Sequence, residues 1–286
     1  MATCEMTDAR LDGLVDGGYM SPQTRSRCRV VYGQSVPAPG PTEVVVFAHF
    51  FHAGLDFPLS TFLRTVLFHF RICLHHLTPN AVSVLSVFAA FCEGWLGVEP
   101  DLDVLVRYYR AQRVGTGCSW GAGSLYFQAR TGDRPFIPVP LISSNAGWRE
   151  LWFYVNVADL HEMPPHDPTP VPDSDRLRWG CPKNRQSRYE AVEARVDLLR
   201  QAGLTGLRVA REFFTRRIAP LAARSRGMWR YEGVDDIDRL VRADLAPDAV
   251  RARVTHIAAG FTDEVWDQLA DLPEPYSSKH PLQVHF

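Results

Sequence analysis

The chain has 286 residues, of which 46% are hydrophobic and 22% charged, and its 31 basic and 32 acidic side chains give a net charge of −1. These values are typical of a folded globular protein, and they exclude a chain that is disordered throughout or basic overall. Any contact with nucleic acid must therefore come from a local patch of basic residues. The six cysteines are scattered and never spaced C-x-x-C, which favours free thiols in a reducing compartment over a disulfide framework.

The N-terminal sequence MATCEMTDARLDGL is polar and acidic, and it lacks the apolar core that a signal peptide carries. We therefore expect an intracellular protein, cytoplasmic or nuclear, that is not secreted. Thr7 and Asp8 precede leucines at helical spacing, which predicts a short capped helix ending at Gly17. A proline- and glycine-rich loop follows, and we assign the helix and the loop to a first region, residues 1–42.

A first helical lobe is expected over residues 43–123. Its opening stretch TEVVVFAHFFHAGLDFP fits a strand over residues 44–47 as well as a helix, and the spacing of its apolar residues favours the helix. Ser60 is a suitable N-cap for the helix that comes next, and the apolar residues of that helix share one face as far as Leu77.

The other two helices of this lobe are marked by their first residues. Thr78 and Pro79 provide an N-cap followed by proline at the first helical position, and this helix is expected to stop at Gly94. A further helix opens at Glu99-Pro100-Asp101 and fades by Gly115. The region is apolar, but a membrane span needs about 20 uninterrupted apolar residues, and arginines and a Thr-Pro-Asn break divide this run. We therefore expect core helices and no membrane partner.

Residues 124–161 show a different period. SLYFQAR alternates, and WRELWFYVNV is rich in aromatic and β-branched residues, which predicts a small antiparallel insert with most of the aromatic rings in the core. A proline-rich connection is expected over residues 162–186, followed by a second helical lobe over residues 187–286. Its helical segments are predicted near residues 187–202, 205–219, 247–259 and 262–270. The predicted fold class is mainly α with a small antiparallel β insert (α+β), with helical lobes either side of a short sheet.

His69, Cys73 and His76 stand at positions i, i+4 and i+7 of a predicted helix, so they could bind zinc from one face. Structural zinc sites usually combine ligands from two tight turns, and the sequence offers no second pair, so histidines on the rim of an apolar helix are the favoured interpretation. The glycine-rich residues 115–123 lack the Lys-Ser/Thr pair of a phosphate loop, and no G-x-S-x-G motif is present. We therefore predict no catalytic residue, no cofactor, no metal and no small-molecule substrate.

The strongest local signal is basic. Between residues 203 and 230 there are seven arginines and one glutamate, which give a local charge of +6. Arginine binds phosphate through paired hydrogen bonds, and the neighbouring Trp229 and Tyr231 could stack on bases. The alternative is that these arginines pair with carboxylates elsewhere in the fold. The candidate nucleic-acid-binding residues are Arg208, Arg211, Arg216, Arg217, Arg224, Arg226 and Arg230.

Several blocks of the sequence, in order over residues 8–260, resemble the gypsy-type transposon domain family of plant retrotransposon-derived proteins. The first block is VVVFAHFFHAGLDFPLSTFLRTVLFHFRICLHHLTPNAVSVLSVFAAFCEGWLGVEP, the second is WRELWFYV, and the third is FFTRRIAPLAARSRGMWRYEGVDDIDR. The segment LDGLVDGG near the N-terminus is also similar to the opening of that family. The resemblance carries over no catalytic residues.

The sequence lacks the enzyme signatures of such an element: the Asp-Thr/Ser-Gly of its protease, the Tyr-x-Asp-Asp of its reverse transcriptase and the zinc-plus-carboxylate set of its integrase. The resemblance therefore implies a non-catalytic, gag-like or accessory protein. We expect it to act by protein–protein association, including self-association, with RNA or DNA contact through residues 208–230. The alternative is an enzyme whose site is not visible in the sequence.

Overall fold

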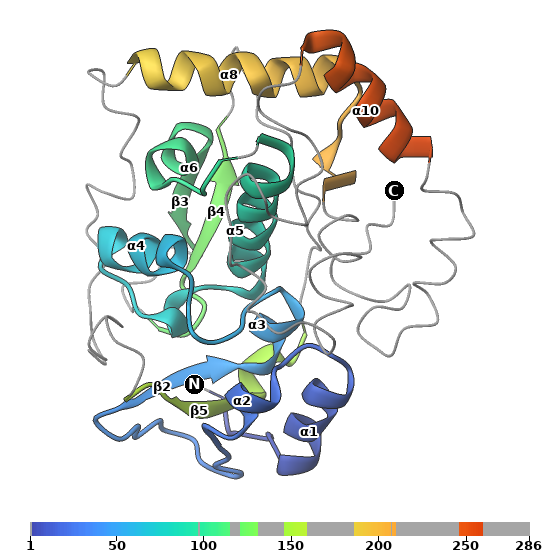
Figure 1. Cartoon of the computed structure of the whole chain (residues 1–286). Coiled ribbons are helices and arrows are strands. Elements are labelled where there is room, and N and C mark those ends of the chain that lie inside the picture. Colours follow the sequence, from blue (N-terminus) through green and yellow to red (C-terminus); the bar gives the residue numbers. More distant parts are fainter. Residues whose placement is uncertain are drawn as a thin grey trace.

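The structure, a computed structural model, describes residues 2–96, 98–114, 121–130, 146–158, 186–206, 208–209 and 246–259. Helices pack with two small antiparallel sheets, so the predicted α+β fold class is confirmed (Figure 1). One sheet has three strands in the order β1-β5-β2, and the other is a two-stranded ribbon of β3 and β4.

The N-terminal helix α1 (Asp8–Asp16) begins where the sequence predicts. The Thr7 hydroxyl accepts a hydrogen bond from the Arg10 backbone N–H, which satisfies one of the amide groups that a helix leaves unpaired at its first turn. A one-turn helix, α2 (Pro22–Arg25), follows with Ser21 as its N-cap. The predicted capped helix is confirmed.

The three-stranded sheet is built from distant parts of the chain. Strands β1 (Cys28–Arg29) and β2 (Glu43–Phe47) flank β5 (Trp152–Asn156), and Val45 of β2 lies opposite Tyr154 of β5. The WFYV strand therefore pairs with N-terminal strands, and the expectation that it would pair within the 124–161 insert is wrong.

The stretch after residue 42 is a strand and then a helix. The helix prediction is wrong over β2, because three successive valines favour the extended backbone over helical spacing. It is right from Ala48 onward, where α3 (Ala48–His52) begins without an intervening loop.

Helix α4 (Thr61–Phe70) begins after Ser60, whose hydroxyl accepts the Leu63 N–H, as predicted. It ends earlier than the sequence predicts, because Arg71 takes a left-handed conformation with φ 52°. A short 3₁₀ turn, η1 (Leu74–His76), then leads to the next helix.

Helix α5 (Pro79–Phe91) has Thr78 as N-cap and proline at its first position, as predicted. It does not stop at Gly94 but continues into a π-helical turn, η2 (Cys92–Leu96). Among the described residues, the stretch Pro79–Leu96 alone is long and apolar enough to span a membrane. However, 89% of that stretch is buried inside the protein, and buried core helices also pass this test of length and hydropathy.

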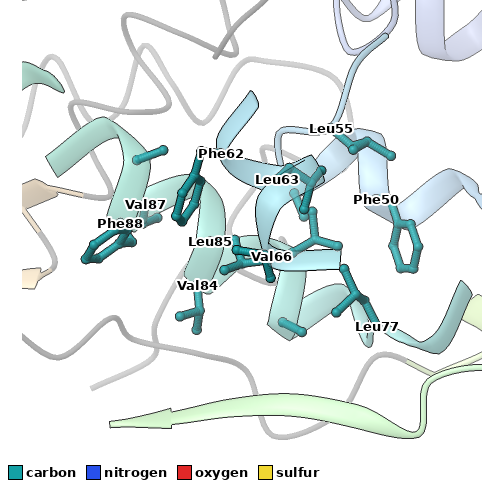
Figure 2. Close-up of a cluster of buried hydrophobic side chains, with 14 of the residues drawn as sticks. Phe50, Leu55, Phe62, Leu63, Val66, Leu77, Val84, Leu85, Val87 and Phe88 are labelled. Atoms are coloured by element: carbon teal, nitrogen blue, oxygen red, sulfur yellow. The ribbon is translucent and has the colours of Figure 1, made fainter. Parts of the chain in front are cut away.

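The core of this region lies between α4 and α5. Figure 2 shows Phe62, Leu63 and Val66 of α4 beside Leu85 and Phe88 of α5. The rings of Phe62 and Phe88 stack with their centroids 5.5 Å apart. These side chains are almost fully buried, which fits the prediction of two packed amphipathic helices.

Helix α6 (Leu102–Tyr108) begins after its N-cap Asp101 and passes directly into β3 (Tyr109–Arg113), which pairs antiparallel with β4 (Leu125–Ala129). The sequence predicts helix as far as Gly115, and this is wrong from Tyr109, where buried and exposed side chains alternate as they do in a strand. Both strands lie beside α5 and α6 (Figure 1).

The remaining described elements are the 3₁₀ turn η3 (Trp148–Glu150) and two helices, α8 (Gln186–Gln201) and α10 (Pro247–Ala259). The helices confirm the segments predicted near residues 187–202 and 247–259. The segment predicted at 262–270 and most of that at 205–219 lie outside the described residues.

Candidate functional site

Arg208 is the one predicted nucleic-acid-binding residue within the described part of the chain. Its Nη1 atom donates to the Gly203 carbonyl oxygen at 2.9 Å, and its backbone N–H donates to the Thr205 hydroxyl at 3.3 Å. Gly203 has φ +88°, so these bonds hold the left-handed turn that follows α8. The other six candidates lie outside the described residues: Arg211, Arg216, Arg217, Arg224, Arg226 and Arg230.

The candidate zinc ligands do not share one helix face. Because α4 ends at Phe70, Cys73 and His76 belong to the η1 turn and its N-cap, whereas His69 remains on α4. The Nδ1 atom of His76 accepts the Cys73 backbone N–H at 3.0 Å. In residues 2–96, 98–114 and the shorter described segments, no group of three or more His, Cys, Asp or Glu side chains is arranged to hold a metal ion.

Two cysteines have thiols that burial keeps protonated. Burial raises the pKa of Cys28 to about 12. The pKa of Cys92 is also raised, first by complete burial and then by the nearby charges of Glu93 and Asp101. Since the thiolate is the nucleophilic form of cysteine, neither side chain is activated for attack at neutral pH.

The β3–β4 ribbon has one buried and one outward face. Because side chains alternate along a strand, Ala111 and Phe127 point to the core, where both are buried. Their neighbours form the outward face, which we call the ribbon face. Its residues are Arg110, Gln112, Tyr126 and Gln128.

Arg110 is the charged residue of the ribbon face. It lies directly opposite Gln128 and is exposed. Its Nε and Nη2 atoms both donate to Oε1 of Gln128, at 3.1 Å and 2.8 Å. Within the described residues Arg110 has no carboxylate partner, so this contact orients the guanidinium without neutralising its charge.

Arg130 follows β4 and borders the ribbon face. Its Nε atom donates to the carbonyl oxygens of Val106 at 2.9 Å and Tyr109 at 3.2 Å. Its backbone N–H donates to the Tyr108 carbonyl at 2.7 Å. These carbonyls lie at the end of α6, where the helix dipole favours a positive charge.

A third arginine, Arg107 in the last turn of α6, lies close to the same place. Its Nε atom pairs with Oε1 of Glu193 on α8 at 2.6 Å. The pKa of Arg130 is lowered by burial first, and then by the charges of Arg110 and Arg107. The positive charges of Arg110 and Arg107 therefore act on Arg130, and Glu193 pairs with Arg107.

Residues 44–113 match the model of a family described as "Putative gypsy type transposon". This segment is therefore similar to gypsy-type transposon domains. It runs from β2 to the end of β3, so it includes the core helices α4 and α5. The WRELWFYV block and the third block of the predicted resemblance lie beyond the matched residues. Searches of curated proteins and of solved structures found no match.

The matched segment supplies Arg107, Arg110 and Gln112, whereas β4 supplies the rest of the ribbon face from beyond it. Sequence reasoning missed this surface because its arginines are separated in the chain. The signal that could have found it is the alternation of polar and apolar residues in YRAQR and LYFQA, which places the polar residues of both strands on one side.

Proposed function

We propose that this chain is a non-catalytic protein of a gypsy-type retroelement, gag-like or accessory. It acts by association with protein, copies of itself included, and contacts RNA or DNA through the arginines of residues 208–230. The observation that supports this proposal most is the match of residues 44–113 to the model of the gypsy-type family.

Three side chains of types that often carry catalysis have structural tasks in this segment. The Thr78 hydroxyl caps α5 and the Nδ1 atom of His76 accepts a backbone N–H. Cys92 is fully buried with a raised pKa. Side chains used in this way are withheld from a substrate, which supports a role in association over a role in chemistry.

The charge distribution supports the nucleic-acid part of the proposal. A chain with a net charge of −1 has little general attraction for polyanions, so contact must depend on a dense local segment. Residues 203–230 carry seven arginines against one glutamate. Each arginine that neutralises a phosphate releases counterions, which makes the affinity strongly dependent on salt.

Association is tested by light scattering on the full chain across a range of concentrations. We expect the mean mass to exceed that of the 32.2 kDa monomer and to rise with protein concentration. A monomer at every concentration would overturn the association part of the proposal.

Nucleic-acid contact is tested by retention on single-stranded RNA at about 50 mM salt, a condition in which phosphate contacts are strong. We expect the full chain to be retained, and the double variant R216E/R217E to elute earlier. The matched control is R10E, which makes the same type of charge change at an exposed arginine of α1. Absence of retention of the native chain would overturn this part.

A further inference from the structure

We propose that the loop between β1 and β2 is a ligand for an aromatic-lined groove of a partner protein, which it enters as a polyproline II segment. The loop spans residues 30–42 and is called the proline loop. The assignment rests on the proposed function, because it names a surface and a class of partner for the protein–protein association proposed above.

The sequence of the proline loop sets its backbone conformation. Prolines stand at positions 37, 39 and 41, and each fixes its own φ at about −65°. Each also restricts the residue before it to extended or polyproline II backbone, which applies to Val36, Ala38 and Gly40. Residues 37–40 accordingly contain neither helix nor strand nor turn. A polyproline II segment has no internal hydrogen bonds, so its carbonyl groups are open to a partner.

Hydrogen bonds to the rest of the protein hold the loop in place. Near its start, the Gly33 N–H donates to the Cys4 carbonyl at 2.8 Å, and the Cys4 N–H donates to the Gln34 carbonyl at 2.8 Å. Further on, the Ala38 N–H donates to the hydroxyl of the buried Tyr154 at 2.7 Å. A segment that is already held in an extended conformation loses little conformational entropy on binding, which favours its use as a ligand.

Residues 37–41 have no backbone N–H left for a partner. Proline has none, and the Ala38 N–H is taken by the bond described above. The Gly40 N–H donates to Oε2 of Glu43 at 2.7 Å. The carbonyl oxygens of residues 37–39 accept no hydrogen bond from the described part of the chain. The partner must therefore supply donors, and the indole N–H of tryptophan and the hydroxyl of tyrosine are donors that aromatic grooves provide.

The side chains of the loop offer an apolar surface to such a groove. Tyr32 is 72% exposed and Val36 is 75% exposed, the two largest exposed fractions among the large hydrophobic side chains of the described residues. A polyproline II segment has three residues per turn, which places Ala38 and Pro41 along one edge, and both are exposed. Aromatic rings of a partner can pack on this edge, as they do on the proline-rich ligands of SH3 and WW domains.

The proline loop is also uncharged. Residues 30–42 contain no acidic or basic side chain. The charged residues on either side of the loop, Arg29 and Glu43, pair with each other at 2.6 Å. A surface of this kind is recognised by packing and neutral hydrogen bonds, so its affinity for a partner should change little with salt. The proposed nucleic-acid contact through residues 208–230 should, in contrast, weaken steeply as salt is added.

The test is isothermal titration calorimetry of the full chain with three isolated domains that have aromatic-lined grooves: an SH3 domain, a WW domain and an EVH1 domain. We expect at least one of them to bind, with an affinity that changes less than about twofold between roughly 50 and 500 mM salt. V36S should weaken this binding at least about fivefold, because it removes an apolar contact. P39A should also weaken it, because Ala38 is then no longer restricted to extended backbone.

The matched control is V114S, which makes the same substitution at another exposed valine, one that is 49% exposed. V114S should bind as the native chain does. Because both valines are exposed, both variants are expected to fold, and a thermal melt checks this. If V36S does not fold, P39A takes its place in the comparison. Equal losses in V36S and V114S would overturn the inference, as would absence of binding by all three domains.

The loop inference and the proposed function fail in different ways. If the native chain associates with itself and none of the three domains binds, the loop inference is wrong while the proposed function stands. If V36S lowers the mean mass in light scattering to that of the monomer, the loop contacts a second copy of the chain, which contradicts a partner of another kind. If the native chain is a monomer at every concentration but binds a domain through the loop, the light-scattering prediction is wrong while the loop inference stands.

Discussion

The two sheets of this protein differ in how many of their faces are buried. In the three-stranded sheet, the adjacent residues Phe153 and Tyr154 point to opposite faces, and both are 0% exposed. In the β3–β4 ribbon, Ala111 is buried whereas the preceding Arg110 is exposed. The side chains of a sheet buried on both faces are used for packing, whereas one exposed face leaves side chains open to solvent.

The N-terminal segment helps to produce this difference. The Sγ atom of Cys4 donates to the Trp152 carbonyl at 2.9 Å, and the indole nitrogen of Trp152 donates to the Ala2 carbonyl at 3.1 Å. From α3, Phe51 stacks against Phe153 with ring centroids 5.8 Å apart. Strand β5 is thereby covered by segments that precede it in the chain by about a hundred residues or more, while Arg110 of β3 and Gln128 of β4 are exposed.

The largest expected effect on stability is that of a charge placed in α5, the helix that packs against elements beside both sheets. Leu85 of α5 is fully buried, and α5 packs against both α3 and β4. L85D should unfold the domain, because burying an unpartnered carboxyl group and losing the packing of Leu85 together cost a large share of the roughly 5–15 kcal/mol of a typical folding free energy. Circular dichroism would measure this. F68D on the exposed side of α4, where the ring is 49% exposed, should fold normally. A folded L85D would show that α5 is not the common core.

The next effect compares the centres of the two sheets. F153A removes a fully buried ring that stacks on Phe51, so we expect a loss of about 3–5 kcal/mol in the free energy of unfolding. Q128A on the ribbon face should change it by less than about 0.5 kcal/mol. Urea denaturation of both variants measures the contrast. Similar losses of unfolding free energy in F153A and Q128A would contradict the distinction between the buried three-stranded sheet and the partly exposed ribbon.

A smaller effect is expected from a single hydroxyl. The Tyr154 hydroxyl oxygen accepts the Ala38 backbone N–H at 2.7 Å, so Y154F should destabilise the protein by about 0.5–1.5 kcal/mol. On the ribbon face, Y126F should have almost no effect on stability. Thermal melts of the two variants provide the comparison, and a Y126F loss equal to that of Y154F would contradict it.

The smallest expected effect is a dependence on pH near the three-stranded sheet. Burial lowers the pKa of His49 on α3 below its ordinary value of 6.5. The unfolded chain therefore binds this proton more readily, and stability should fall as the pH drops below 6.5 toward the folded pKa. H49F should flatten this part of the stability profile. Subtracting the unfolding free energy of H49F from that of the native chain at each pH isolates the contribution of His49. A difference that does not change with pH would contradict this prediction.

Local features of this fold could be predicted from the sequence, because their causes are local. Thr7, Ser60 and Thr78 each cap the helix that the sequence assigns to them, since an N-cap is a hydrogen bond within four residues. The partners of β5 could not be predicted, because its alternation says that it is a strand but not which distant strand it joins.

The two groups of arginines, those of residues 203–230 and those at the β3–β4 ribbon, also differ in whether the sequence reveals them. The arginines of residues 203–230 are visible as a run of charge, which a reading along the chain detects at once. Arg110 and Arg130 are brought together only by the pairing of β3 with β4. The sequence does not reveal β3, because this strand follows α6 directly with no turn between them. A surface made by strand pairing has no contiguous signal in the sequence.

The central position of β5 bears on the boundaries of the gypsy-type domain. Residues 44–113 contain β2 but neither of the strands that complete its sheet, and β5 is made more than a hundred residues after β2. During synthesis the three-stranded sheet cannot be completed until residue 156 has left the ribosome. A fragment cut at the limits of the family match would leave the edge of β2 that pairs with β5 without a partner strand.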